Sequence, residues 1–187
     1  MLQKLEGSFH QEETRHYRAS YVFTDLSADA VRVVFHYKVT GGDFSRAGEC
    51  SSRLKTNLLR LGISPAAVRP IAIATYEAEM NIVIFTPGGD ITVEVSPEQV
   101  AVTAVDNGPG ITDIEKAMQP GYSTAPDWVR ELGFGAGMGL PNIKRNSDTM
   151  NIESRPGKGT KLEFTARLGK PELVNNSLDE GTEENES

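Results

Sequence analysis

The sequence contains little cysteine and little histidine. Its single cysteine, Cys50, excludes a disulfide bond within the chain and is typical of a reducing compartment. The three histidines, His10, His16 and His36, lie in the first fifth of the chain and lack the pairing that a structural zinc site needs. No apolar run of about 18 residues occurs, and the N-terminus lacks a signal-peptide core. These absences predict a soluble cytoplasmic protein that does not contact a membrane.

Negative charge is concentrated at the C-terminal end. The 187 residues include 19 Lys and Arg against 26 Asp and Glu, which gives a formal net charge of −7. Residues 170–187 carry one lysine and six acids, or −5, so the rest of the chain carries only −2. A nearly neutral folded part argues against direct binding to nucleic acid. We predict an N-terminal extension of unassigned structure (1–30), one globular domain (31–169) and a disordered acidic tail (170–187).

Hydrophobic periodicity predicts the main elements of this domain. Alternating apolar residues predict strands over 31–39, 91–95, 100–105, 150–154 and 161–168. Helical spacing predicts an amphipathic helix that Asp43 or Ser45 caps, a second helix from Pro65 to about Phe85, and a short helix over 140–145. The second helix is apolar on nearly every side, which is typical of a helix in the middle of a fold.

A carboxylate and an amide lie one turn apart on the second helix, at Glu77 and Asn81. Burying a carboxylate without partners is costly, so this face is expected to line a wet or ligand-filled cleft. A carboxylate beside an amide oxygen can act as a base next to a ligand for Mg²⁺. The alternative is an ordinary pair that faces solvent. Glu79 points to another side of the helix and is expected to be a surface charge.

Two further segments are candidates for ligand binding. Asp106 begins an Asp-Asn-Gly-Pro-Gly sequence directly after a strand, where its carboxylate can accept a hydrogen bond from an amino group such as that of adenine. An ordinary turn is the alternative. Residues 133–140 have glycine at every second position before a helix, so their backbone N–H groups can bind phosphate. This spacing matches neither the P-loop nor the dinucleotide fingerprint, and a flexible linker is the alternative.

Together, in this order and spacing, these segments resemble the N, G1 and G2 boxes of the GHKL ATPase superfamily. The boxes are residues 77–81, 106–110 and 135–140, and the Pro-Gly-Lys-Gly-Thr sequence at 156–160 resembles the final Gly-Thr element beside the adenine pocket. The resemblance covers residues 32–169. It implies an α/β fold of the two-layer α+β kind: a mixed, mostly antiparallel Bergerat-type sheet, covered on one face by helices, with a flexible ATP lid over about 112–136.

Within the superfamily, the chain is similar to the small anti-sigma-factor serine kinases and switch kinases. From its length we expect no transducer domain like that of the gyrase, chaperone and mismatch-repair members, and from its sequence we expect no long helix pair like that of sensor histidine kinases. The resemblance implies an ATP- and Mg²⁺-dependent protein serine/threonine kinase. Its implied substrate is a STAS-type anti-anti-sigma protein. The resemblance also allows a sigma factor as a second partner and a homodimer as the assembly.

The resemblance assigns roles to the site residues. Glu77 is the implied general base, Asn81 the ligand of Mg²⁺, and Asp106 the acceptor for the adenine amino group, with Thr160 nearby. The remaining residues are implied to contact ATP or ADP: Gly108 and Gly110 admit the nucleotide, and Gly135, Gly137, Gly139 and Leu140 form the phosphate cradle.

One segment departs from the family pattern. Many relatives have a Lys, Arg or His in the turn after the Asn of the N box, whereas this chain has Ile82 to Phe85, including Ile84. Charge neutralisation is thereby left to Mg²⁺ or to Lys144, Arg145 or Lys158. The departure favours a second hypothesis, in which the chain is a nucleotide-gated module that sequesters a regulatory partner without phosphorylating it.

Overall fold

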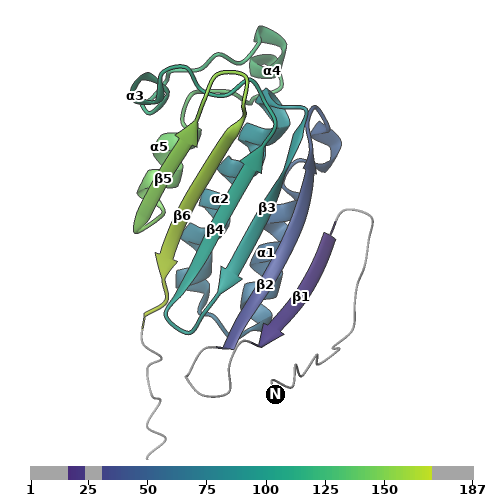
Figure 1. Cartoon of the computed structure of the whole chain (residues 1–187), viewed down its shortest axis with the longest axis vertical. Helices are drawn as coiled ribbons and strands as arrows, with labels where there is room; N and C mark the ends of the chain where they lie inside the picture. Colours follow the sequence, from purple (N-terminus) through teal and green to yellow (C-terminus); the bar gives the residue numbers. More distant parts are fainter. Residues whose placement is uncertain (1–16, 24–30, 170–187) are drawn as a thin grey trace, which may run out of the picture.

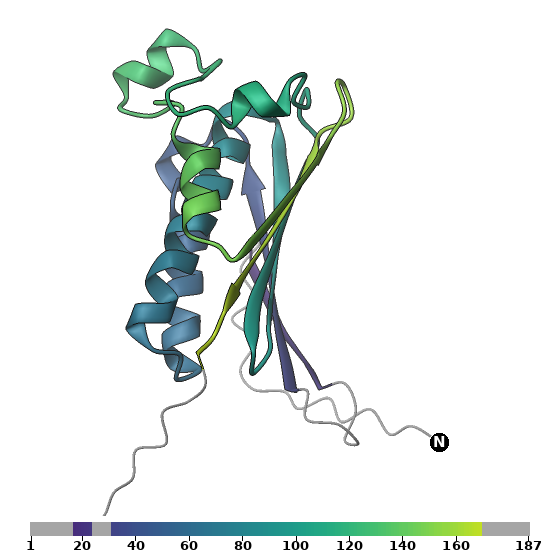
Figure 2. The same ribbon diagram turned by 90° about the vertical axis from the view of Figure 1, so that its left-hand side faces the viewer.

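The structure, a computed structural model, describes residues 17–23 and 31–169. Six strands form one sheet in the order β1-β2-β3-β4-β6-β5, and helices α1, α2 and α5 cover one of its faces (Figures 1 and 2). The predicted two-layer α+β fold with helices on one face is confirmed. All strand pairs in the described part are antiparallel, whereas the resemblance implied a mixed sheet.

The elements have the following bounds. The strands are β1 (Tyr17–Phe23), β2 (Val31–Thr40), β3 (Gly88–Val95), β4 (Gln99–Asp106), β5 (Thr149–Ser154) and β6 (Thr160–Arg167). The helices are η1 (Phe44–Arg46), α1 (Glu49–Arg60), α2 (Pro65–Phe85), α3 (Ile114–Ala117), α4 (Asp127–Glu131) and α5 (Gly139–Arg145). Strand β1 falls within the extension that the sequence left unassigned; the rest of that extension and the predicted acidic tail lie outside the described residues.

The core lies between the sheet and the helices. Every second residue of a strand points to the same face. In β2, Phe35 and Tyr37 are buried, whereas Lys38, the residue after Tyr37, is exposed. Phe164 of β6 and Leu54 and Leu58 of α1 are almost inaccessible to solvent. The apolar alternation of the central strands therefore packs one sheet face against the helical layer.

Helix α2 begins and ends where the sequence predicts. The side chain of Ser64 accepts a hydrogen bond from the backbone N–H of Ala67, and Pro65 occupies the first turn, where its missing N–H costs nothing. The hydroxyl of Thr86 donates to the carbonyl of Ile82 at the other end. Helix α2 contacts α1, α5 and strands β2, β3, β4 and β6, so the prediction of a central helix is confirmed.

Helix α1 starts later than predicted. The expectation that Asp43 or Ser45 caps it is wrong, because a 3-10 turn occupies residues 44–46 and the helix begins at Glu49. The hydroxyl of Ser45 instead donates to the carboxylate of Asp43 at 2.6 Å. The residue that precedes α1 is Gly48, which has no side chain to cap the helix.

The segment between β4 and α5 lies beyond one end of the sheet and contains α3 and α4 (Figure 2). The sequence predicts a loop here, and these two short helices were not foreseen. Asp113 begins α3 by accepting a hydrogen bond from the backbone N–H of Lys116. In the part of the chain that the structure describes, no helix combines the length and the apolarity needed to cross a membrane.

Candidate functional site

A cavity of about 450 Å³ lies between α2, the ends of β4 and β6, and the segment that leads to α5. This volume lies within the range of pockets that hold small ligands. The structure brings together most of the predicted site residues: Glu77, Asn81, Asp106, Gly110, Gly135, Gly137, Gly139, Leu140 and Thr160 all line the cavity. Gly108 does not line it; this buried residue packs behind Asp106 and against Thr86.

Glu77 and Asn81 face the first residue of α5. A Cβ added at Gly139 would lie 3.1 Å from Oδ1 of Asn81 and 3.5 Å from Oε2 of Glu77. The other carboxylate oxygen of Glu77 accepts a 2.7 Å hydrogen bond from the side-chain amide of Asn142. The sequence motifs assign no role to Asn142, which lies on α5 three residues after the last glycine of the glycine-rich run. The contact holds a carboxylate at the same end of the cavity as the last glycine of that run.

Asp106 lies at the end of β4 in a network of backbone donors. Its Oδ1 accepts a 2.7 Å hydrogen bond from the N–H of Gly108. Burial raises the pKa of Asp106 above the ordinary aspartate value, and hydrogen bonds from the backbone of Gly108 and Thr160 oppose this rise. Asp106 is therefore a half-buried acceptor, held in a fixed orientation at the wall of the cavity.

The glycine-rich run is packed against the segment that precedes it. A Cβ at Gly135 would lie 2.5 Å from that of Ala125, and one at Gly137 would lie 2.5 Å from the carbonyl oxygen of Tyr122. The N–H of Gly121 also donates to the carbonyl of Gly137 at 2.9 Å. A larger side chain at either position would displace the segment, so close backbone packing is one reason for glycine there.

The lining of the cavity is acidic. It includes the carboxylates of Glu77, Asp106 and Asp113, and none of the described residues that line it is Lys or Arg. The three basic residues that could neutralise phosphate charge according to the sequence are exposed and do not belong to this lining; they are Lys144, Arg145 and Lys158. Ile84 and Phe85, the residues that replace the expected cation, do line it.

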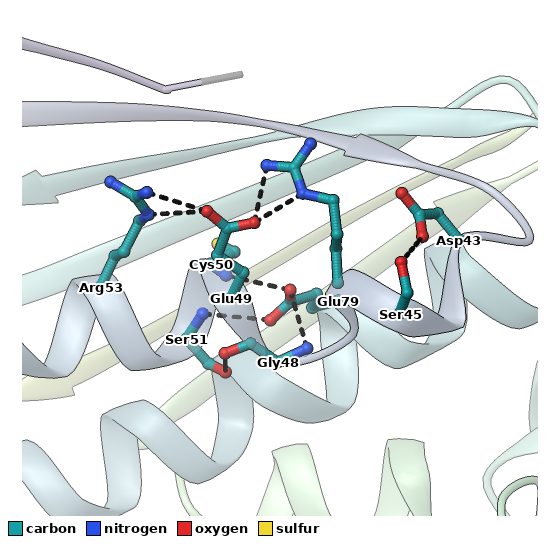
Figure 3. A network of polar contacts seen from close by, with 9 residues as sticks. Asp43, Ser45, Gly48, Glu49, Cys50, Ser51, Arg53 and Glu79 are labelled. Atoms are coloured by element: carbon teal, nitrogen blue, oxygen red, sulfur yellow. Dashed lines mark hydrogen bonds and ion pairs between the residues drawn. The ribbon is translucent and has the colours of Figure 1, made fainter. Parts of the chain in front are cut away.

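Glu79 is not a surface charge, contrary to the sequence expectation. Its side chain is 2% exposed, and its carboxylate accepts hydrogen bonds from the backbone N–H groups of Gly48, Cys50 and Ser51 at 3.0 to 3.1 Å (Figure 3). Burial raises the pKa of Glu79, and these three hydrogen bonds oppose the rise. The carboxylate thus caps α1 from a different helix, where the partial positive charge of the helix N-terminus also stabilises it.

The sequence matches, over residues 68–170, the family described as histidine kinase-, DNA gyrase B- and HSP90-like ATPases. The chain belongs to this family. Membership of this ATPase family implies that the chain binds ATP, and the matched residues include the cavity-lining residues of α2, β4, α5 and β6. The family expected from the motifs is therefore confirmed.

Several individual proteins are similar to this member of the ATPase family. An anti-sigma F factor of Thermoanaerobacter sp. (strain X514) is 38% identical over 106 residues, which cover 55% of this chain and 64% of that protein. The serine/threonine-protein kinase RsbT of Bacillus subtilis (strain 168) is 33% identical over 107 residues, covering 55% and 74%. The SiaB-SiaC complex from Pseudomonas aeruginosa contains a chain with a TM-score of 0.46 and 13% identity, covering 71% and 89%. The chain spans about half to just under two thirds of the length of the anti-sigma F factors it matches.

Proposed function

We propose that this protein is a cytoplasmic protein serine/threonine kinase that phosphorylates a STAS-type antagonist and thereby controls a sigma factor. The family membership supports ATP as the phosphate donor. The names of the relatives, an anti-sigma F factor and a serine/threonine-protein kinase, support a partner-switching role. The sigma factor itself and a homodimeric assembly belong to the same proposal.

The contact between Glu77 and Asn142 carries the kinase proposal. Binding of ATP alone does not require a base, yet this chain orients a carboxylate at the glycine-rich end of the cavity with a 2.7 Å hydrogen bond. In the proposed reaction, Glu77 takes the proton of a serine or threonine hydroxyl. The hydroxyl oxygen then bonds to the γ-phosphorus, the bond from that phosphorus to the bridging oxygen breaks, and ADP leaves.

The donor set fits Mg²⁺ as a companion of ATP. Asn81 offers a hard amide oxygen toward Gly139, and Mg²⁺ is usually held by few protein oxygens together with phosphate and water. Among the described residues, there is no cluster of three or more His, Cys, Asp or Glu side chains that could bind a metal ion without help from a nucleotide. We therefore propose that Asn81 holds Mg²⁺ only together with the nucleotide, where the ion neutralises phosphate charge.

The acidic lining favours a second candidate function. Ile84 and Phe85 occupy the position where a phosphate-facing cation is expected, and no lysine or arginine among the described residues replaces it in the lining. A protein with slow phosphate transfer can still change shape when it binds a nucleotide. The second candidate is therefore a nucleotide-gated module that sequesters its partner without modifying it.

One experiment separates the two functions. The full chain is mixed with Mg²⁺-ATP and the STAS proteins of the same genome, and phosphoserine and phosphothreonine are measured by mass spectrometry. The kinase predicts one modified STAS protein, and it predicts that Glu77→Ala abolishes transfer while ATP affinity stays within about twofold. If every STAS protein with a suitable hydroxyl remains unmodified but one binds in a nucleotide-dependent way, the kinase proposal is wrong and the module is favoured.

A further inference from the structure

The segment of residues 41–48, between β2 and α1, is hydrogen-bonded to α2 at two points. The N–H of Gly42 donates to the carbonyl of Val83 at 2.8 Å, and the N–H of Gly48 donates to Glu79 at 3.1 Å. Val83 and Glu79 are four residues apart and so lie one turn apart on the same face of the helix. The segment therefore has a fixed position relative to the helix that carries Glu77.

Glu79 provides the stronger of these two attachments. The first N–H groups of an α-helix have no partner within the helix, and the residue before the helix usually satisfies them. Gly48 cannot do so, and the buried carboxylate of Glu79 accepts from Gly48, Cys50 and Ser51 instead (Figure 3). Ion pairs of Glu49 with Arg53 and Arg46 stabilise the same turn on its outer side.

Phe44 lies in the middle of this segment and contacts the stretch that the family resemblance predicts to be the ATP lid, residues 112–136. Its ring packs edge-on against Trp128 of α4, with centroids 5.4 Å apart and an interplanar angle of 76°. Its ring also packs against Phe134, with centroids 5.7 Å apart. Phe134 lines the cavity and lies within the glycine-rich run, between Gly133 and Gly135. The aromatic contacts of Phe44 thus connect the cavity-lining part of the lid with residues 41–48, which are hydrogen-bonded to α2.

We propose that the lid packs against Phe44 when it closes over bound nucleotide; we call Phe44 the seat of the lid. We also propose that Glu79 is a positioning residue that keeps this seat in place. The inference depends on ATP binding, which the family implies, and not on phosphate transfer. A lid that rests on a fixed seat keeps Phe134 and the glycines after it at the cavity. Release of the seat should let the lid open and the nucleotide leave faster, with little effect on the adenine end of the cavity.

The chain contains one tryptophan, and it is Trp128 in this contact, so its fluorescence reports directly on the lid. The experiment measures the emission maximum of the full chain and its quenching by acrylamide, with and without Mg²⁺-ADP. In the wild type, we expect the nucleotide to lower quenching. In Phe44→Ala, quenching should be high in both states, and the Kd for Mg²⁺-ADP should rise about three- to tenfold, which is the scale of one or two lost aromatic pairs.

Three further variants test the assignment. Phe44→Tyr keeps the ring and should restore the wild-type quenching and Kd. Leu132→Ala is the matched control, because Leu132 follows α4 in the same lid, is 56% exposed and has no ring to stack on Phe44. Glu79→Gln keeps the shape of the side chain but removes the charge that three N–H groups share. It should reproduce a weaker form of the Phe44→Ala signature in a protein whose circular dichroism is unchanged.

Two results would overturn the inference. If Phe44→Ala keeps both the wild-type Kd for Mg²⁺-ADP and the nucleotide-dependent drop in quenching, Phe44 is not the seat of the lid. If Glu79→Gln lowers only the unfolding midpoint and leaves Kd and quenching unchanged, Glu79 supports the fold without positioning the seat. Loss of phosphate transfer affects neither measurement, so the test is independent of the kinase proposal.

Discussion

The side-chain amide of Asn142 donates a 2.7 Å hydrogen bond to the carboxylate of Glu77, which lies 65 residues earlier in the chain. The contact joins α5, which follows the glycine-rich run, to the middle of α2. One amide thereby restricts the rotation of the carboxylate that we propose as the general base. The orientation of the base consequently depends on the position of α5 relative to α2.

Asn142→Ala should slow phosphate transfer more than it weakens nucleotide binding. A misplaced base reacts more slowly even when the substrate is bound, so we expect transfer to fall by about ten- to a hundredfold. The Kd for Mg²⁺-ATP should change by about twofold or less. Asn146→Ala is the control, because the side-chain amide of Asn146 donates to a backbone carbonyl of the same helix, that of Asn142, and not to Glu77. An Asn142→Ala variant that transfers phosphate at the wild-type rate would contradict this assignment.

The acidic lining predicts strong dependence of ATP affinity on Mg²⁺. Three carboxylates and no lysine or arginine among the described lining residues leave a triphosphate without a protein cation to neutralise it. Removing Mg²⁺ with EDTA should weaken ATP binding at least about tenfold in calorimetry. Adenosine, which has no phosphates, is the control and should bind equally well with and without EDTA. Equal ATP affinity in both buffers would show that another group neutralises the phosphates.

The raised pKa of Asp106 predicts a pH dependence for adenosine binding. The ionised carboxylate accepts a hydrogen bond more strongly than the protonated one, so affinity is greatest above the pKa of Asp106. Because burial raises this pKa, affinity should begin to fall at a higher pH than an ordinary aspartate would cause. Calorimetry with adenosine avoids the titration of phosphate groups. Asp106→Asn should bind weakly at every pH, and a variant that retained the pH step would assign the step to a different group.

Gly110 should tolerate alanine much less well than Gly157 in the facing turn. Both have a positive φ, near +73° and +74°, which costs an alanine about 1 to 2 kcal/mol. A Cβ at Gly110 would also lie 2.2 Å from the carbonyl oxygen of Arg155, whereas one at Gly157 meets open space. Urea unfolding should therefore show Gly110→Ala to be less stable than Gly157→Ala by at least about 1 kcal/mol. Equal stabilities would mean that the two turns can separate freely.

Elements whose cause is local were predictable from the sequence. Helix α2 could be placed because Ser64 and Pro65 are adjacent in the chain and form its cap themselves. The central strands were found because their apolar alternation matches a sheet with one covered face. The pairing of Glu77 with Asn81 was visible as a helical spacing, and the structure places both side chains at one cavity.

Features that depend on distant partners were not predictable. Glu79 was expected at the surface because nothing in α2 indicates that the uncapped end of α1, about 30 residues earlier, lies beside it. Asn142 is one amide in a short helix, and no pattern connects it with Glu77. The contact of Phe44 with Trp128 joins two segments 84 positions apart, and the sequence near Trp128 reads only as a loop.

Helix α2 has a further consequence because it touches both neighbouring helices and four strands while forming one wall of the cavity. Binding of a ligand to such a helix is thermodynamically linked to the cooperative unfolding of the whole domain. Nucleotide should therefore raise the melting temperature and slow amide hydrogen exchange in β3 and α1, although the residues of these two elements do not line the cavity. In a cell, the same linkage would make resistance to proteolysis rise and fall with the adenylate supply.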